Sequence, residues 1–105
     1  MISTQVIDVA KGEPAGRVPV ELDYFITGQG WREIAHSVTS RDGRIAEFGE
    51  SPAAGVYRMM FDVGAYMPHC FFPSVTVTIE VREANHDHHI ILQVSPFGYS
   101  ICRTE

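Results

Sequence analysis

The segment His86-Asp87-His88-His89 holds the densest group of side chains with useful chemistry in this chain. Residues two apart on a strand point to the same face, so a His-x-His pair could hold Zn²⁺ at about 2.0–2.1 Å. No cysteine or third histidine lies at a standard spacing from this pair, and Asn85 marks a turn beside it. The pattern therefore favours a solvated hairpin with one useful histidine, and we expect neither a metal nor a cofactor.

Two arginines and one amide are further candidate residues. Arg44 follows Asp42-Gly43 and so leaves a tight turn at the start of a strand, and Arg103 lies three residues from the end. A guanidinium is a rigid fork of donors that suits a carboxylate, urea-like or imide oxygen, although a solvated edge charge is the more common case. Gln5 is a polar residue within an otherwise apolar and hydroxyl-bearing strand.

Length and composition limit the classes of protein to consider. The chain has 105 residues, 45% of them hydrophobic, which predicts a single globular domain over residues 1–105. Eight basic residues are scattered against thirteen acidic ones, so we expect no nucleic-acid partner. No run approaches the roughly 18 apolar residues of a membrane span, so we expect no membrane partner. Without a secretory signal, we expect a cytoplasmic protein in which Cys70 and Cys102 are reduced.

Alternating apolar and polar residues dominate the chain and predict strands. The clearest runs are 18–25 and 75–81, and turn-forming clusters of Gly, Pro, Asp and Ser separate them from weaker candidates. The weaker candidates cover residues 3–9, 31–39, 55–61, 89–94 and 98–103. Residues 62–67 alone indicate a short helix, with Asp62 as its cap and Pro68 after its end. The fold class expected is an all-β, two-sheet sandwich of seven to eight strands with one short helix.

One predicted strand is apolar on both faces at Ile90-Ile91-Leu92. A strand of this kind suggests a second surface that another subunit covers. A central strand covered by a loop explains the composition nearly as well, so both interpretations stay open at this point.

Five segments resemble one family when they are taken in order along the chain. They are Ile2-Ser3-Thr4, Asp42-Gly43-Arg44, Tyr57-x-x-x-Phe61-Asp62, Phe71-Phe72-Pro73-x-Val75-Thr76-Val77 and Ser95-Pro96-Phe97-Gly98-Tyr99-Ser100. With them the chain resembles the transthyretin-like family, and more narrowly the 5-hydroxyisourate hydrolases of urate breakdown, over about residues 2 to 103.

The resemblance implies a sandwich of eight strands with a short helix after the fifth. It also implies a homotetramer, a dimer of dimers, with active sites in a central channel at the dimer–dimer interface. Enzymes of this group add water across a cyclic amide of 5-hydroxyisourate. Carried over by motif, their catalytic arginines fall on Arg44 and Arg103, and one catalytic histidine falls on His89.

The chain departs from the family pattern at both ends. The N-terminal Ser-Thr-His-Val is here Ser3-Thr4-Gln5-Val6, so Gln5 occupies the position of a second catalytic histidine. The C-terminal Tyr-Arg-Gly-Ser is here Cys102-Arg103-Thr104-Glu105. We expect Cys102, Glu105 and Ser100 to contact the substrate.

The function expected is therefore hydrolytic opening of a cyclic amide, with 5-hydroxyisourate as the substrate. An amide cannot relay a proton near pH 7, so Gln5 leaves His89 as the sole base. The alternatives are an enzyme of the same scaffold for another small heterocycle, and a non-catalytic binding protein of the transthyretin type.

Overall fold

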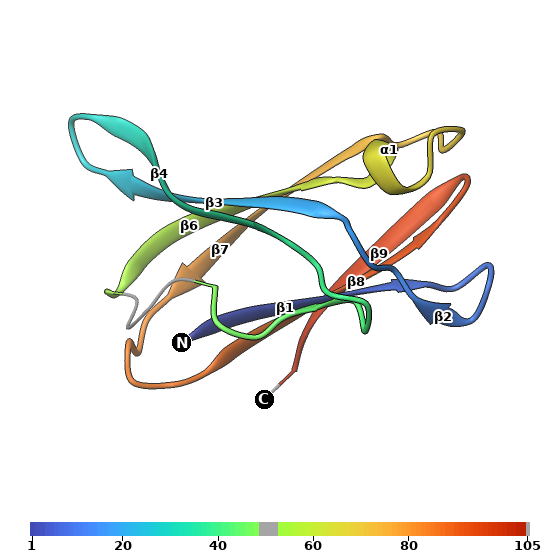
Figure 1. The fold of residues 1–105 in the computed structure, drawn as a ribbon. Coiled ribbons are helices and arrows are strands. Elements are labelled where there is room, and N and C mark those ends of the chain that lie inside the picture. The colour runs from blue at the N-terminus through green and yellow to red at the C-terminus, as the bar shows by residue number, and fades with distance from the viewer. Residues whose placement is uncertain (49–52, 105) are drawn as a thin grey trace.

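Two β-sheets pack face to face in the computed structural model, which describes residues 1–48 and 53–104 (Figure 1). Sheet A has the order β2-β1-β8-β9, with β5 also paired to β1, and sheet B has the order β4-β3-β6-β7. Their strands and the single helix are β1 (Ile2–Asp8), β2 (Glu13–Pro14), β3 (Pro19–Ile26), β4 (Gly30–Val38), β5 (Arg44–Ile45), β6 (Gly55–Asp62), α1 (Val63–Tyr66), β7 (Ser74–Val81), β8 (His88–Ser95) and β9 (Gly98–Thr104).

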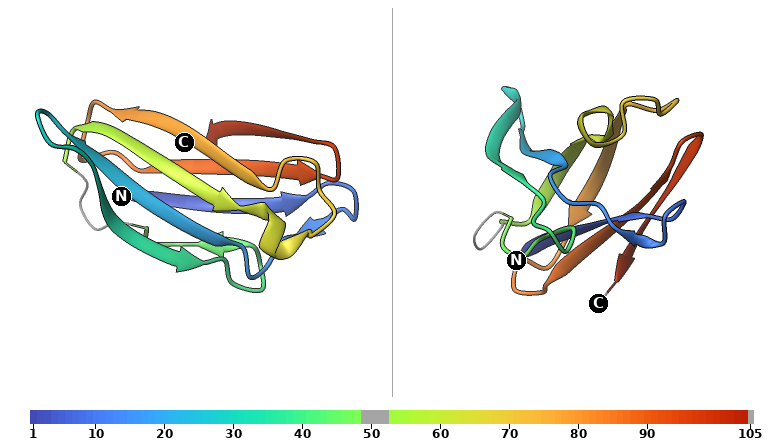
Figure 2. Two further views of the ribbon diagram at one scale, coloured as in Figure 1. Left: turned by 90° about the horizontal axis from the view of Figure 1, so that it is seen from above. Right: turned by 45° about the vertical axis from the view of Figure 1, so that its right-hand side comes forward.

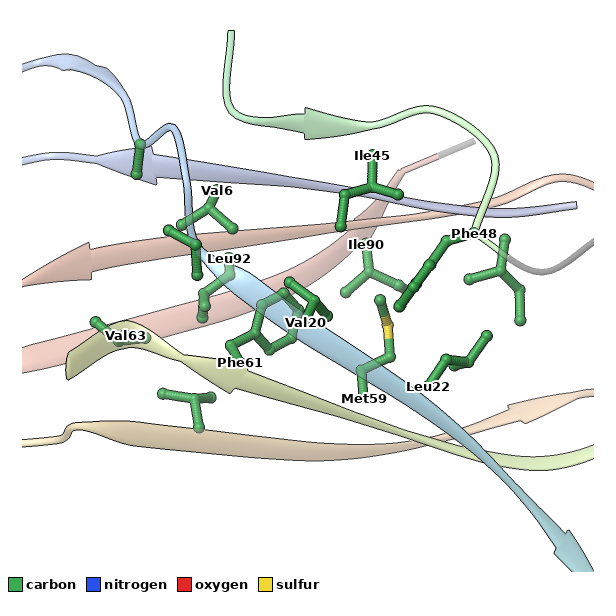
Figure 3. Packing of buried hydrophobic residues seen from close by; sticks show 14 of the residues in the cluster. Val6, Val20, Leu22, Ile45, Phe48, Met59, Phe61, Val63, Ile90 and Leu92 are labelled. Atoms are coloured by element: carbon green, nitrogen blue, oxygen red, sulfur yellow. The ribbon is translucent and has the colours of Figure 1, made fainter. Parts of the chain in front are cut away.

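Alternation along each central strand supplies the core between the sheets. From sheet A, Val6, Ile90 and Leu92 point inward, and each is at most 4% exposed (Figure 3). From sheet B, Leu22 and Phe61 meet them and are fully buried. Because side chains on a strand alternate with a period of two, the remaining residues of β1 and β8 must point to the outer face of sheet A.

The helix α1 directly follows β6 of sheet B, and a hydrogen bond from Tyr66 links it to sheet A. Asp62 caps it by accepting a hydrogen bond from the Ala65 amide at 3.2 Å, as the sequence predicted. The Tyr66 hydroxyl donates to the buried Asp8 carboxylate at 2.8 Å, at the end of β1. Burial and this bond raise the pKa of Tyr66 to about 12. Within residues 1–48 and 53–104, no helix is long and apolar enough to cross a lipid bilayer.

The expected all-β sandwich is confirmed, and seven of its nine described strands match the predicted runs within two residues. The two shortest strands, β2 and β5, have two residues each and pair with β1. β5 begins at Arg44, where a strand was expected after the turn, whereas residues 13–14 were expected to be part of a turn because Gly12 and Gly16 flank them and Pro14 is one of them. A two-residue strand has no periodicity to detect, so its partner rather than its own sequence defines it.

The outer face of sheet B carries a buried charge that the alternation pattern did not predict. Asp23 on β3 is only 3% exposed, and its Oδ2 accepts hydrogen bonds from Arg58 Nη2 at 2.8 Å and Nε at 3.2 Å. The Arg58 guanidinium in turn lies over the Trp31 ring, 4.3 Å from its centroid. Arginine and indole together shield this carboxylate from water on an otherwise solvent-facing surface.

Glu21 lies two residues before Asp23 on the same face of β3. A hydrogen bond to Asp23 is the main cause that raises the pKa of Glu21 to about 7, followed by burial and by the charges of Asp23 and Glu33. Asp23 Oδ1 is buried and has no hydrogen-bond partner among the described residues, so it is free to accept a hydrogen bond from a protonated Glu21. The folded chain therefore binds a proton here that an unfolded chain releases near pH 4.5.

The folded state binds this proton more tightly than the unfolded state does. We therefore expect the free energy of unfolding to fall as pH rises between about 4.5 and about 7. Glu21→Gln keeps a donor at this position and removes the titration. Urea unfolding measured at several pH values from about 4.5 to about 7 should show a smaller decline in the free energy of unfolding for this variant than for wild type. Glu47→Gln, at an exposed carboxylate outside sheet B, should keep the wild-type slope. Equal slopes for Glu21→Gln and wild type would contradict the shared proton.

Candidate active site on sheet A

Sheet A, with β1 among its strands, packs against sheet B (Figure 2). Alternate residues of β1 and β8 are buried in the core, so the candidate residues between them lie on the outer face of sheet A. The parallel pairing of β1 with β8 sets Ser3 beside His89 and Gln5 beside Ile91. On its other side, β1 pairs with β5 and sets Gln5 opposite Arg44. Residues far apart in the sequence thus form two adjacent lines on one face, Arg44–Gln5–Ile91 and Ser3–His89, which together make up the row described below. The predicted Gln5, Arg44 and His89 lie on this face, and the charge of Arg44 acts on the His89 ring.

His89 is half-buried in this row, and its ring has one fixed partner. Its Nδ1 lies 2.7 Å from the Ser3 hydroxyl oxygen. Burial and, to a smaller extent, the positive charge of Arg44 lower the pKa of His89 below 6.5. Its imidazole is therefore mainly neutral at pH 7, which is the form that can accept a proton from water.

A tight turn presents Arg44 at the edge of the row. The Ser40 hydroxyl donates to the Asp42 carboxylate, and the Gly43 amide donates to the Ser40 carbonyl at 2.8 Å. The bond from Ser40 is the main cause that lowers the pKa of Asp42. Gly43 has a φ of +78°, and a Cβ there would lie 2.5 Å from the Val6 carbonyl oxygen. The turn therefore packs directly against β1 and needs glycine to do so.

Strand β9 adds hydroxyl and thiol groups to the same outer face. Cys102 pairs with Ile91, and Ser100 pairs with Gln93. The Ser100 hydroxyl donates to the Gln93 side-chain oxygen at 2.9 Å. Both predicted residues thus lie on the face that carries His89, with Cys102 a free and exposed thiol. Glu105, the third predicted substrate contact, lies outside the described residues.

Arg103 does not join this row within one chain. It pairs with Ile90, whose side chain is buried between the sheets, so Arg103 extends from the opposite face of β9. There it lines a cleft of about 390 Å³ with Glu80, Arg82, Glu83, His86 and His88. The structure thus separates Arg103 from Arg44 and His89.

Two histidines at the start of β8, His86 just before it and His88 as its first residue, contact groups of Glu83. His86 Nδ1 lies 2.8 Å from a Glu83 carboxylate oxygen, and His88 is buried with Nε2 3.3 Å from the Glu83 carbonyl. Across residues 1–48 and 53–104, no three His, Cys, Asp or Glu side chains are grouped so that they could hold a metal ion.

Two residues near His89 were not among the predicted site residues. Ser3 contacts its ring directly, and Thr104 lies opposite it on β9. Both lie within segments compared with the family above, but small hydroxyl side chains are common in strands, so the segments did not single them out as site residues. Only the strand register brings them to His89.

The profile of the HIUase/Transthyretin family matches residues 2–104. The chain belongs to this family. The uric acid degradation bifunctional protein TTL of Arabidopsis thaliana is 36% identical over 97% of this chain, which spans only 36% of that protein's length. The chain therefore corresponds to about a third of this relative.

Members of the HIUase/transthyretin family with solved structures include an enzyme and a hormone-binding protein. Klebsiella pneumoniae 5-hydroxyisourate hydrolase superposes with a TM-score of 0.85 at 28% identity, covering 99% of this chain and 98% of the enzyme. Sea bream transthyretin in complex with thyroxine gives 0.90 at 29% identity, covering 98% and 93%. The fold alone therefore does not distinguish hydrolysis from binding, and the residues on sheet A must do so.

The turn before Arg44 yields a prediction for the glycine that shapes it. Gly43→Ala should destabilise the chain by more than about 1–2 kcal/mol, because a left-handed backbone is strained for alanine and the methyl group meets the Val6 carbonyl. Gly12→Ala is the matched control, since its φ is +68° but nothing lies within 4 Å of the added carbon. Chemical unfolding should show the larger loss at position 43. Equal losses would show that packing against β1 is unimportant.

Proposed function

We propose that this chain hydrolyses a cyclic amide of 5-hydroxyisourate within urate degradation. The observation that carries the proposal is that His89, with its lowered pKa, and Arg44 lie on the same face of sheet A. A neutral base and a guanidinium are the two groups that water addition to an amide needs. The named activities of the Arabidopsis and Klebsiella relatives support the choice of substrate.

In the proposed reaction, His89 Nε2 takes a proton from water while the water oxygen attacks the amide carbonyl carbon. Arg44 stabilises the negative charge that develops on the carbonyl oxygen. The C–N bond then breaks, and the His89 imidazolium returns the proton to the departing ring nitrogen. The ring opens to a carboxylate on one side and an N–H group on the other, with one water consumed.

Gln5 binds rather than reacts in this scheme. Its side-chain amide lies between Arg44 and Ile91 in the row, so it can orient the water or the substrate by donating and accepting hydrogen bonds. Ser100 and Cys102 supply further polar contacts on β9. Arg103 extends from the other face, so its proposed role is to support the C-terminal segment and not to contact the substrate in the same chain.

The proposed enzyme is a cytoplasmic homotetramer, a dimer of dimers. The outer face of sheet A carries the half-buried side chains Gln5, His89 and Ile91. A second copy of this face opposite the first would enclose the row and exclude bulk water, which strengthens charge interactions with a small heterocyclic substrate.

A second candidate is an enzyme of the same scaffold with a different heterocyclic substrate. The observation in its favour is that Gln5 and Cys102, two departures from the family pattern, flank Ile91 from both sides on the same face. A binding protein without catalysis is the third candidate, and retention of both Arg44 and His89 argues against it.

The test follows 5-hydroxyisourate optically as it decays after its formation from urate by urate oxidase. The full chain should accelerate decay well beyond the spontaneous rate, and kcat/KM should decline on the acid side only below pH 6.5. His89→Ala should lower the rate about 10²–10⁴-fold, which is the usual contribution of a positioned base. Arg44→Ala should lower the rate about 10²–10³-fold, which is the usual contribution of one charge-stabilising donor.

Matched controls come from sheet B, where His36 and Arg32 are exposed on β4. His36→Ala and Arg32→Ala should keep the wild-type rate, and sedimentation should give four chains for every variant. Activity within threefold of wild type in both His89→Ala and Arg44→Ala would refute the site. No acceleration by a folded wild-type tetramer would favour the second candidate.

Restoring the family's histidine tests the part that Gln5 plays. Gln5→His adds a second group that can relay a proton on the same face as Arg44 and His89. We expect 5-hydroxyisourate hydrolysis to rise by up to about 10²-fold if the rest of the pocket suits this substrate. Gln5→Asn, which keeps an amide without a titratable group, should give no gain. No gain from Gln5→His either would point to a pocket adapted to another ring.

A further inference from the structure

The contact between Ser3 and His89 is the shortest side-chain link in the row, at 2.7 Å between the hydroxyl oxygen and Nδ1. It joins two parallel strands at directly paired positions, so the backbone ladder on both sides holds it in place. Ser3 is half-buried, and its hydroxyl makes no other hydrogen bond within the described chain. The hydroxyl is thus committed to this ring.

This contact has a chemical consequence because the two ring nitrogens of histidine are different. One is protonated and the other is bare in neutral imidazole, and the partner of one nitrogen decides the state of the other. With Nδ1 on Ser3, only Nε2 remains free to face water or substrate. If Ser3 donates, Nε2 carries the proton and cannot act as a base. If Ser3 accepts, Nε2 is bare.

We propose that Ser3 is the positioning residue of His89: its oxygen accepts a hydrogen bond from Nδ1–H and so keeps Nε2 free to act as the base. This inference rests on the proposed function, which requires a bare Nε2 for removal of the water proton. No second histidine of the described residues shares this face with His89 to perform that step, because position 5 is glutamine and His88 is buried on the inner face of β8. The tautomer of one ring therefore controls the reaction.

The surroundings of His89 suit a neutral partner of this kind. Among residues 1–48 and 53–104, the charged group that acts on the His89 ring is the Arg44 guanidinium on β5, and it favours the neutral ring. The other side chains on this part of the face are Gln5 on β1 and Cys102 and Thr104 on β9. A carboxylate in place of Ser3 would favour the imidazolium and oppose this effect. A hydroxyl orients the ring without adding charge.

The experiment records ring-nitrogen spectra of the full chain labelled with ¹⁵N at histidine, through a pH titration. Bare and protonated ring nitrogens resonate far apart, so the tautomer is read directly. In wild type we expect protonated Nδ1 and bare Nε2 at neutral pH for His89. Ser3→Val and Ser3→Thr are the matched pair, since they have nearly the same shape and only threonine keeps a hydroxyl.

Loss of the hydroxyl in Ser3→Val should mix the two tautomers and lower the pKa of His89 further, because Ser3 bonds most strongly to the protonated ring. We expect kcat to fall about 10-fold with KM little changed, as for loss of one hydrogen bond to a charged group. Ser3→Thr should restore both the tautomer and kcat. Ser37→Ala, on β4 of the other sheet, should alter neither.

A wild-type ring with protonated Nε2, or a pKa of His89 that rises in Ser3→Val, would overturn the proposal. Both readings come from spectra and need no turnover. If the spectra show the expected tautomer but the chain does not hydrolyse 5-hydroxyisourate, the proposed function is rejected. The arrangement of Ser3 and His89 is supported in that case.

Discussion

The parallel pairing of β1 with β8 is the constraint on which the candidate site depends. It is the one parallel ladder among the described strands, and it joins the two ends of the chain with residue 3 beside residue 89. The same strand also accepts β2 and β5 along its other edge. A single strand thus sets the positions of Gln5, Arg44 and His89, although more than 80 residues separate the first from the last.

The core protects this register. Val6 and Leu92 are completely buried on the inner face of sheet A, so a slip by one residue would expose them and bury Gln5 and His89 instead. Burial of each large apolar side chain stabilises the fold by about 1.5–3 kcal/mol, whereas burial of an unpaired polar group costs energy. The alternation that builds the core therefore also orders the polar face outside it. Packing and chemistry depend on the same register.

The two sheets use their outer faces for different chemistry. Sheet A presents a neutral histidine near an arginine, which suits water activation. On sheet B, Asp23 instead forms an ion pair with Arg58, whose guanidinium stacks on the Trp31 ring, and Glu21 holds a proton. These groups suit a structural role. On each face, burial and neighbouring charges shift the pKa of one group, but only on sheet A is that group a histidine, which can act as a base near neutral pH. A shifted pKa alone does not identify a catalytic group.

The sequence by itself determined the fold class, because the alternation in 18–25 and 75–81 and the cap at Asp62 depend on local physics. Its family motifs also identified Arg44 and His89, which the structure brings to one face. It could not place Arg103, because the inward or outward direction of a terminal strand residue follows from its pairing with Ile90. Nor could the sequence identify Ser3 as the partner of His89, or predict that the Asp23 carboxylate is buried. Periodicity describes one strand at a time, whereas register between strands distant in sequence, and the side chains it brings into contact, exist only after the sheets have assembled.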